Sequence, residues 1–176
     1  MMIPKPGIMD TDPNQEWAMP DESTVDNLYE TTLEYYNLRP ILKDMPAKTP
    51  RGPTPDAPAE NALLSATMLA AMRGRRVLEV ASGAGTVTVE VAGMADYILA
   101  TDITPNTLKI ARENITLHNV DFLQCDAFDL RPIKGNFNAG LVAGFFHVCP
   151  YSRHREFTTS LHSKLMPGST VFMRSS

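Results

Sequence analysis

The chain has 176 residues, 43% of them hydrophobic, and a formal net charge of −4. This length suffices for one domain with a substantial core, and the negative charge gives no general attraction to nucleic acid or anionic membranes. Its two cysteines, Cys125 and Cys149, lack metal-ligand or redox spacing, so we expect no metal site. No apolar run is long enough to cross a bilayer and no secretion signal is recognisable, so we expect a cytoplasmic protein without a membrane partner.

The first 58 residues differ in composition from the rest, because ten of the fourteen prolines lie in this part. A capping-box pattern at Ser23 introduces apolar residues at helical spacing, and a proline-rich connector follows over 44–58. We therefore expect residues 1–58 to form an extension with one helix. Tyr29 and Tyr36 lie on its apolar stripe, where they either pack as core or cover a bound ligand as a lid.

From residue 59 onward, helical and strand patterns alternate. A helix over 59–73, ended by Gly74, comes first. The expected strands are 76–81, 97–102, 120–124, 138–144 and 170–174, and the expected helices are 86–93, 105–116 and 153–165. This alternation predicts an α/β domain over 59–176, with a doubly wound, mostly parallel sheet covered by helices on both faces.

The most informative segment is 77–86, which reads VLEVASGAGT. An apolar run containing a single carboxylate, Glu79, leads into small residues that include Gly83 and Gly85. This is typical of a buried parallel strand that turns sharply into a helix and leaves its backbone open to a ligand. A second apolar run ends on Asp102, 17 residues after Gly85. A carboxylate at that strand end is placed to bind the hydroxyls of a ribose.

Two classes of ribose-bearing cofactor share this layout. A dinucleotide site would continue with a third glycine, but that position is Thr88, and Glu79 would face the pyrophosphate with a like charge. S-adenosylmethionine has no phosphate and carries an ammonium and a sulfonium, so a carboxylate near the turn is compatible with it. In this interpretation Glu79 accepts N–H groups of the turn and lies near the ammonium of the donor.

With these motifs in place, the segment from Arg73 to Met173 resembles the class I S-adenosylmethionine-dependent methyltransferases. The matching pieces are the glycine turn, Asp102, the acidic loop at 124–128, the strand and turn at 139–147 and the Leu-x-Pro-Gly turn at 165–168. The resemblance implies a Rossmann-like fold with strand order 3-2-1-4-5. It implies cofactor contacts from Glu79, Ala81, Ser82, Gly83, Gly85, Thr86, Asp102, Ile103, Cys125, Asp126, Ala127, Gly144 and Phe145. In this resemblance Asp126 belongs to the adenine-contacting segment, although an aspartate at this position could equally be a solvated surface residue.

The chain departs from the family pattern at three places. Ala81 stands where the family has its first glycine, and Asn138 is the nearest candidate for the acidic or polar residue that the family carries near the start of the fourth strand. The sequence also stops at Ser176, where the family normally adds a helix and a strand hairpin. We therefore expect a domain that is short at its C-terminus. A sheet that ends at the fifth strand would expose an edge to which a second copy or another chain could pair.

Among the four histidines, His147 is the candidate general base. It follows the fourth strand, and a neutral imidazole there could take a proton from an O–H or N–H acceptor. The alternative is a histidine packed under the turn by the preceding phenylalanines. His154 and His162 lie on the last expected helix, where we expect them to be solvated.

Together these features predict a methyltransferase that uses S-adenosylmethionine, releases S-adenosylhomocysteine and acts on an O or N atom of a small-molecule acceptor. Two other hypotheses remain open. The chain could bind the cofactor without catalysis and act through a partner, or it could be a nicotinamide-dependent oxidoreductase, against which Thr88 argues.

Overall fold

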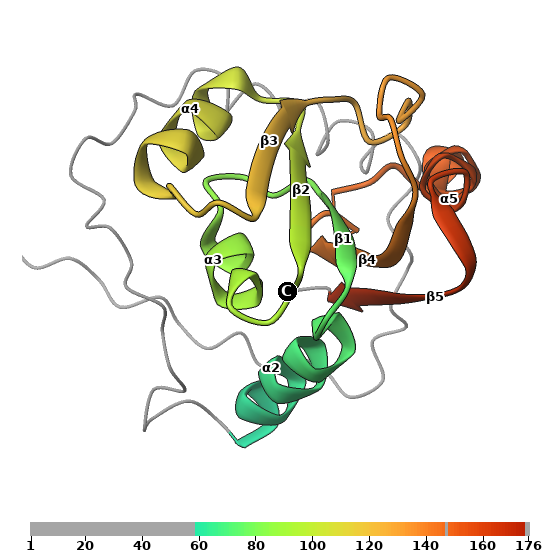
Figure 1. Ribbon diagram of the computed structural model, residues 1–176. Helices are drawn as coiled ribbons and strands as arrows, with labels where there is room; N and C mark the ends of the chain where they lie inside the picture. Colours follow the sequence, from blue (N-terminus) through green and yellow to red (C-terminus); the bar gives the residue numbers. More distant parts are fainter. Residues whose placement is uncertain (1–58, 147, 175–176) are drawn as a thin grey trace, which may run out of the picture.

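The computed structural model describes residues 59–146 and 148–174, with side chains described from residue 66 onward (Figure 1). The expected N-terminal extension, the lid candidates Tyr29 and Tyr36, and the candidate base His147 lie outside the described residues. Within the described part, no helix has the length and apolar run needed to cross a bilayer, and no group of three or more residues that could hold a metal ion comes together.

Helices and strands alternate as expected, with differences confined to their ends. The elements are α2 (Ala59–Met72), β1 (Arg76–Val80), α3 (Thr86–Ala92), β2 (Tyr97–Asp102), α4 (Pro105–Asn114), β3 (Val120–Gln124), β4 (Phe137–Ala143), η1 (Tyr151–Arg153), α5 (His154–His162) and β5 (Leu165–Arg174). The largest difference is in β5, which begins five residues before its expected start.

All five strands form one parallel sheet in the order β3-β2-β1-β4-β5, which confirms the expected fold. In the register of this sheet Val80 lies beside Thr101 and Asp102 lies beside Gln124. The carboxyl ends of β1, β2 and β3 therefore meet at one edge. The turn after β1 and the acidic tip of β2 become neighbours there, although 17 or more residues separate them in the chain.

The sheet has a core on each face because successive side chains of its strands point to opposite sides. In β1, Leu78 packs into the cluster on the α5 side with Phe157, and Val77 packs into the other cluster with Met72 of α2 and Val91 of α3. Figure 1 shows α3 and α4 on one side of the sheet and α5 on the other. Since Glu79 is two residues from Val77, its carboxylate points into the side covered by α3.

The β4–β5 pairing contains an irregularity that explains the early start of β5. Leu165 pairs with Phe137, but the next pair is Thr170 with Ala139, so four residues of β5 form a loop inside the strand. Gly168, at φ 79°, lies in this loop, which is the Leu-x-Pro-Gly turn expected from the sequence. β5 is an edge strand whose Met173 is 44% exposed. Pairing of another chain along this edge stays a prediction.

Candidate functional site

The turn between β1 and α3 is held by backbone hydrogen bonds. The N–H of Ser82 donates to the carbonyl of Thr101 on β2 (2.9 Å), and the N–H of Gly85 donates to the carbonyl of Ser82 (3.0 Å). Ala81, Gly83 and Gly85 all have positive φ, at 56°, 56° and 84°. This left-handed backbone favours glycine, which accounts for two of the three residues.

Ala81 is the one described non-glycine residue with positive φ. We expect Ala81→Gly to raise the free energy of unfolding by about 0.5–1 kcal/mol. Left-handed backbone costs a non-glycine residue roughly 1–2 kcal/mol, and the extra unfolded-state entropy of glycine offsets about 0.4–1 kcal/mol of the relief. Urea unfolding of both proteins measures the difference, and a destabilised variant would contradict the strain at this position.

The two glycines of the turn face different surroundings. A Cβ built on Gly83 would meet no atom of the described residues within 4 Å, whereas one built on Gly85 would collide with Cδ1 of Ile115. The Gly85 side is therefore closed by the end of α4, whereas no residue in the described part of the chain closes the Gly83 side. An open, side-chain-free surface at this edge fits the close approach of a ligand to the backbone.

Asp102 joins the turn to the start of α4. Its side chain is largely buried, since the residue is 9% exposed. Oδ2 accepts the N–H of Gly83 (2.8 Å), and Oδ1 accepts the N–H of Thr104 (2.8 Å) and the hydroxyl of Thr107 (3.3 Å). A carboxylate offers about four acceptor sites, so Asp102 keeps capacity for one further donor beside the open surface of Gly83.

Ser82 contributes an unpartnered polar atom to the same turn. Its Oγ is buried, and it has no hydrogen-bond partner among the described residues. A buried hydroxyl without a partner is costly, and its presence at a turn is a sign of a missing polar ligand. With the open Gly83 surface and the spare acceptor of Asp102, it shows that the residues present fit a polar, ribose-bearing cofactor.

Glu79 is fully enclosed and bonded to a side chain rather than to the turn. Its Oε2 accepts the hydroxyl of Thr88 on α3 at 2.7 Å, and Thr88 is itself buried. The expectation that Glu79 accepts backbone N–H groups of the turn is therefore corrected, because its carboxylate points away from them toward α3. Thr88, which takes the place of a third glycine, is the residue that holds Glu79.

Burial raises the pKa of Glu79 from its ordinary value of 4.5 to about 7; the hydrogen bond from Thr88 opposes this rise and the charge of Asp102 adds to it. Between pH 4.5 and 7 the folded protein thus binds a proton at this site that the unfolded chain has released. Its contribution to stability is complete below pH 4.5 and is lost as the pH rises through 7.

We expect Glu79→Gln to remove this loss. Glutamine keeps an acceptor for Thr88 but cannot ionise. The free energy of unfolding of the variant should therefore rise by about 2–3 kcal/mol relative to that of the wild type as the pH increases from 4.5 to 8. Chemical unfolding of both proteins across this pH range measures the difference. A constant difference in stability across the range would show that Glu79 titrates normally in the fold.

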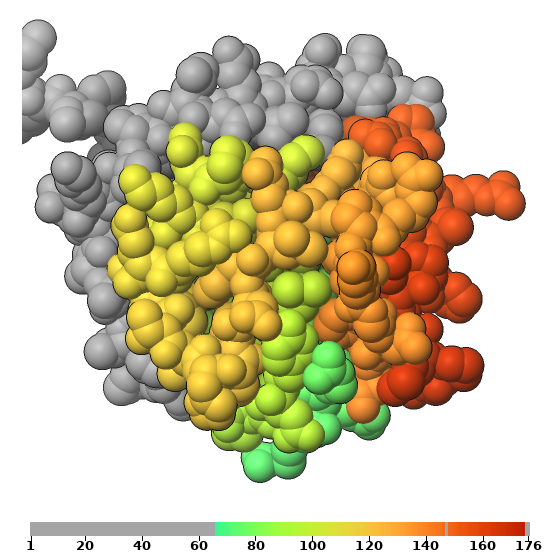
Figure 2. All heavy atoms as spheres, turned by 45° about the horizontal axis from the view of Figure 1, so that its top comes forward, coloured from blue at the N-terminus to red at the C-terminus, as the bar shows by residue number. Residues whose placement is uncertain are grey.

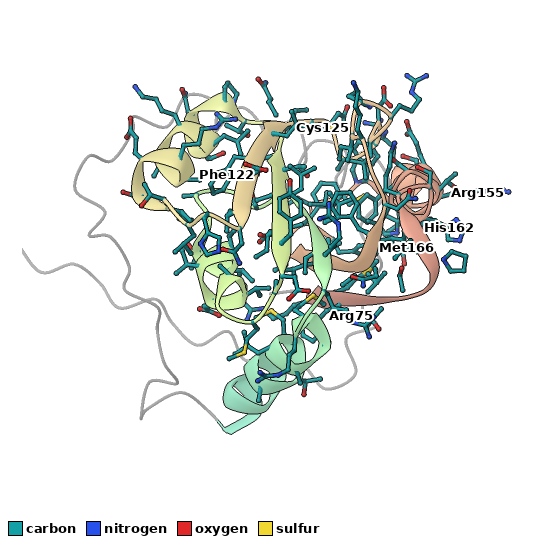
Figure 3. All side chains as sticks on the ribbon, viewed as in Figure 1. Arg75, Phe122, Cys125, Arg155, His162 and Met166 are labelled. Atoms are coloured by element: carbon teal, nitrogen blue, oxygen red, sulfur yellow. The ribbon has the colours of Figure 1, made fainter. Side chains whose placement is uncertain are left out.

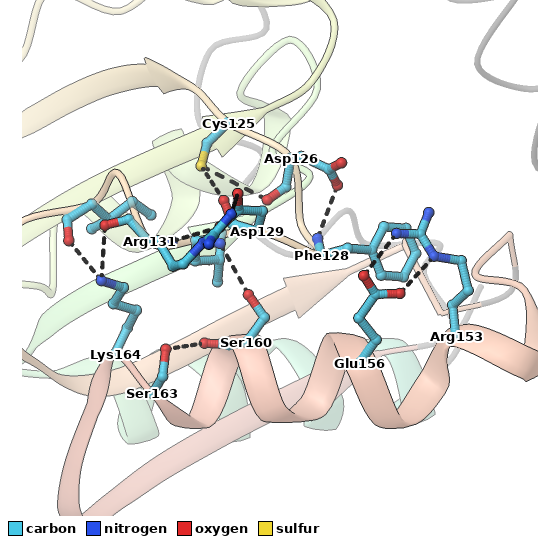
Figure 4. A network of polar contacts seen from close by, with 12 residues as sticks. Cys125, Asp126, Phe128, Asp129, Arg131, Arg153, Glu156, Ser160, Ser163 and Lys164 are labelled. Atoms are coloured by element: carbon cyan, nitrogen blue, oxygen red, sulfur yellow. Dashed lines mark hydrogen bonds and ion pairs between the residues drawn. The ribbon is translucent and has the colours of Figure 1, made fainter.

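The loop after β3 carries the expected adenine-contacting residues and is fixed at both ends (Figure 4). Cys125 continues the sheet through its N–H, which donates to the carbonyl of Asp102 (3.0 Å), and its thiol donates to the carbonyl of Asp129 (3.3 Å). Oδ1 of Asp126 accepts the N–H of Phe128 (2.9 Å), which shapes the loop, and Ala127 is buried beside them. Burial raises the pKa of the Cys125 thiol, so it acts as a packed, neutral group.

The same loop is clamped onto α5. The guanidinium of Arg153 lies 3.4 Å from the ring centre of Phe128, and Ser160 Oγ accepts the N–H of Leu130 (3.0 Å). Lys164 Nζ donates to the carbonyl of Ile133 (2.8 Å). Figure 2 shows the surface of this loop between the α4 side and the α5 side of the molecule. These contacts hold the loop in place at the carboxyl edge of the sheet.

The turn after β4 completes the edge. Gly144 has φ 84° and donates its N–H to the carbonyl of Arg174 on β5 (3.0 Å). The ring of Phe145 packs 5.0 Å from that of Phe157 and is 6% exposed, so its side chain belongs to the core. Only the backbone of Phe145 is left to face a ligand.

The structure thus brings Gly83, Ser82 and Asp102 together, with Cys125 next to them. Glu79 lies on the inner side of the turn, and Thr86 and Ile103 begin the segments that follow the two strand ends. Figure 3 shows Cys125 at this edge and Arg75 at the opposite end of β1. Sequence reasoning missed Thr88, Thr104 and Thr107 as donors to the two carboxylates. They lie two to nine residues from the carboxylate that each one supports, which is a weak signal in a sequence.

Comparisons with known proteins agree with this geometry. Residues 77–168, just over half of the chain, match the family model described as a methyltransferase domain. The solved DhpI-SAM-HEP complex is 28% identical, with a TM-score of 0.62 over 82% of this chain and 64% of that chain. A DhpI-SAH complex matches with the same identity and TM-score.

Two curated proteins match shorter segments. A putative protein N5-glutamine methyltransferase of Methanocaldococcus jannaschii is 35% identical over 46% of this chain, and a ubiquinone/menaquinone biosynthesis C-methyltransferase of Azotobacter vinelandii is 29% identical over 57%. The chain spans 42% of the length of each. By its matched domain, its sheet order and its solved neighbours, the chain belongs to the methyltransferase-domain family and has the fold of the class I S-adenosylmethionine-dependent methyltransferases.

Proposed function

We propose that this chain binds S-adenosylmethionine across the carboxyl ends of β1, β2 and β3 and transfers its methyl group to an O or N atom of a small molecule. The observation that carries the proposal is the arrangement around Asp102. Its Oδ2 holds the N–H of Gly83 at 2.8 Å and keeps room for another donor, beside the open Gly83 surface and the unpartnered Ser82 hydroxyl.

Each part of the edge has a role in this proposal. Asp102 would accept the ribose hydroxyls, Ser82 would bond a polar group of the cofactor, and Asp126 and Ala127 would flank the adenine. S-adenosylmethionine supplies a methyl group already activated by the sulfonium, so the protein mainly aligns the acceptor and excludes water. His147 is the proposed proton acceptor for an O–H or N–H substrate.

Charge and composition support a small acceptor. The net charge of −4 gives no general attraction to nucleic acid. The buried thiols of Cys125 and Cys149 form no disulfide, which fits the reducing cytoplasm that we propose as the location. Carbon and protein side-chain acceptors, named for the two curated relatives, are the alternatives that the experiment below separates.

The test has two steps. Calorimetry should first show binding of S-adenosylmethionine and S-adenosylhomocysteine, and no micromolar binding of NADH. The protein is then incubated with methyl-labelled cofactor and cell extract, which is separated into small-molecule, protein and nucleic-acid fractions. Label in the small-molecule fraction, absent with Asp102→Ala, is the expected result, and label only in protein would contradict the acceptor class.

Cofactor binding without transfer to any fraction would favour a second candidate, a cofactor-binding relative that acts through a partner. The exposed side chains of the edge strand β5, Val171 (37%) and Met173 (44%), are the observation in its favour.

A further inference from the structure

In the segment that follows β4, three aromatic rings form a stack that leads from the core to the surface. The ring centre of Phe146 lies 6.0 Å from that of the fully buried Phe157 and 4.5 Å from that of His154. The ring of Tyr151 stacks on His154 at 4.7 Å with an interplanar angle of 30°. Phe146, His154 and Tyr151 are called the aromatic stack below.

The outermost ring of the stack is open to a ligand. Tyr151 is 61% exposed, although one face of its ring is covered by His154. The other face is therefore in solvent. An exposed ring that is already held in place by stacking loses little side-chain entropy when a second ring packs on it. This differs from an ordinary surface tyrosine, which would have to be ordered on binding.

His154 is fixed by a hydrogen bond as well as by its neighbours. Its Nε2 lies 3.1 Å from the carbonyl oxygen of Cys149, and a carbonyl can only accept, so Nε2 carries the proton. The Cys149 N–H in turn donates to the carbonyl of Phe145 (3.1 Å), which follows the end of β4. The expectation that His154 is solvated is corrected in part, because the residue is half-buried and the loop after β4 folds back to hold its ring.

The stack lies at the edge of the sheet that carries the proposed cofactor site. Phe146 follows the turn after β4, and Tyr151 and His154 belong to η1 and the start of α5, which leave that edge. Arg153, between them, contacts Phe128 of the loop after β3. Arg153 thus links the segment that carries the aromatic stack to the loop that would contact the adenine.

The charges beside the stack favour a neutral ligand. Arg153 precedes His154 in the chain and forms an ion pair with Glu156 at 2.8 Å. Because this pair carries no net charge, it gives no preference for a charged ligand. A neutral planar ring fits the exposed face of Tyr151.

We propose that the aromatic stack is the acceptor platform of the enzyme, and that its substrates are planar aromatic molecules, such as phenols or aromatic amides, which stack on Tyr151. This inference deepens the proposed function and rests on it for the identification of the ligand as methyl acceptor. Binding of planar rings to the stack itself needs no cofactor, because no ring of the stack belongs to the glycine turn.

The test compares planar probes with saturated molecules that carry the same polar group. Phenol is paired with cyclohexanol, and benzamide with cyclohexanecarboxamide. Affinities are measured by ligand-observed NMR titration, with the protein alone and loaded with S-adenosylhomocysteine. We expect each planar probe to bind at least fivefold more tightly than its saturated counterpart, and Tyr151→Ala to remove this preference.

Two variants control for other effects. Tyr151→Phe keeps the ring and should keep the preference, and Arg155→Ala, whose side chain points away from the sheet in Figure 3, should change nothing. Equal affinities within each pair, a preference that survives Tyr151→Ala, or an equal loss with Arg155→Ala would overturn the platform. Calorimetry with S-adenosylhomocysteine on the same samples tests the proposed function separately, since Tyr151→Ala should leave that affinity unchanged.

Discussion

Asp102→Ala is expected to weaken binding of S-adenosylmethionine by a hundredfold or more and to lower the free energy of unfolding by about 2–4 kcal/mol. The carboxylate accepts the N–H groups of Gly83 and Thr104 and the hydroxyl of Thr107. Each buried donor left without a partner costs about 1–3 kcal/mol, partly recovered by water that enters the gap. The proposed ribose bonds are charge-assisted, and a loss of about 2.7 kcal/mol corresponds to the hundredfold change.

Asp121→Ala is the matched control for this variant. Asp121 lies on β3 beside β2, is exposed, and accepts the hydroxyl of Tyr97 at 2.9 Å. A surface hydrogen bond of this kind contributes at most about 1 kcal/mol, and the residue lies away from the carboxyl edge. Calorimetry gives the affinities and urea unfolding the stabilities. Equal affinities of the two variants for S-adenosylmethionine would show that Asp102 does not bind the cofactor.

Gly85→Val and Gly83→Val should affect different properties, although both residues have positive φ in the same turn. We expect Gly85→Val to lower the free energy of unfolding by about 3–4 kcal/mol. A β-branched residue is strained at φ 84°, at a cost of about 2 kcal/mol. Its Cβ would also collide with the tip of the Ile115 side chain, and displacing that tip adds about 1–2 kcal/mol, in the lower part of the range for overpacking.

Gly83→Val should cost only the backbone strain, about 2 kcal/mol, because open space surrounds its Cβ position. The new side chain would instead fill the surface that the cofactor approaches, so binding of S-adenosylhomocysteine should fall at least a hundredfold in a protein that still folds. Thermal unfolding and calorimetry on both variants measure the two effects. A Gly83→Val protein that binds the cofactor normally would place the ligand elsewhere.

Local patterns were sufficient for the elements and for the motif at the sheet edge. Short apolar runs such as 77–80, followed by small residues, report a buried parallel strand and its turn regardless of what surrounds them. The position of Asp102 at the end of a second run placed it at the same edge, because carboxyl ends of parallel strands meet there. The strand order itself came from the resemblance to a family, since periodicity does not specify which strands are neighbours.

The contacts that give the site its properties needed the folded chain. The Glu79–Thr88 bond depends on the angle at which α3 packs on the sheet, and the spare acceptor of Asp102 depends on the register of β1 with β2. The stack of Tyr151 on His154 depends on a loop that folds back onto the end of β4. Sequence therefore determined which residues line the edge of the sheet, because strands and turns follow from local composition. Tertiary structure alone decided which side chains point at each other, because that follows from packing angles and register between segments distant in the chain.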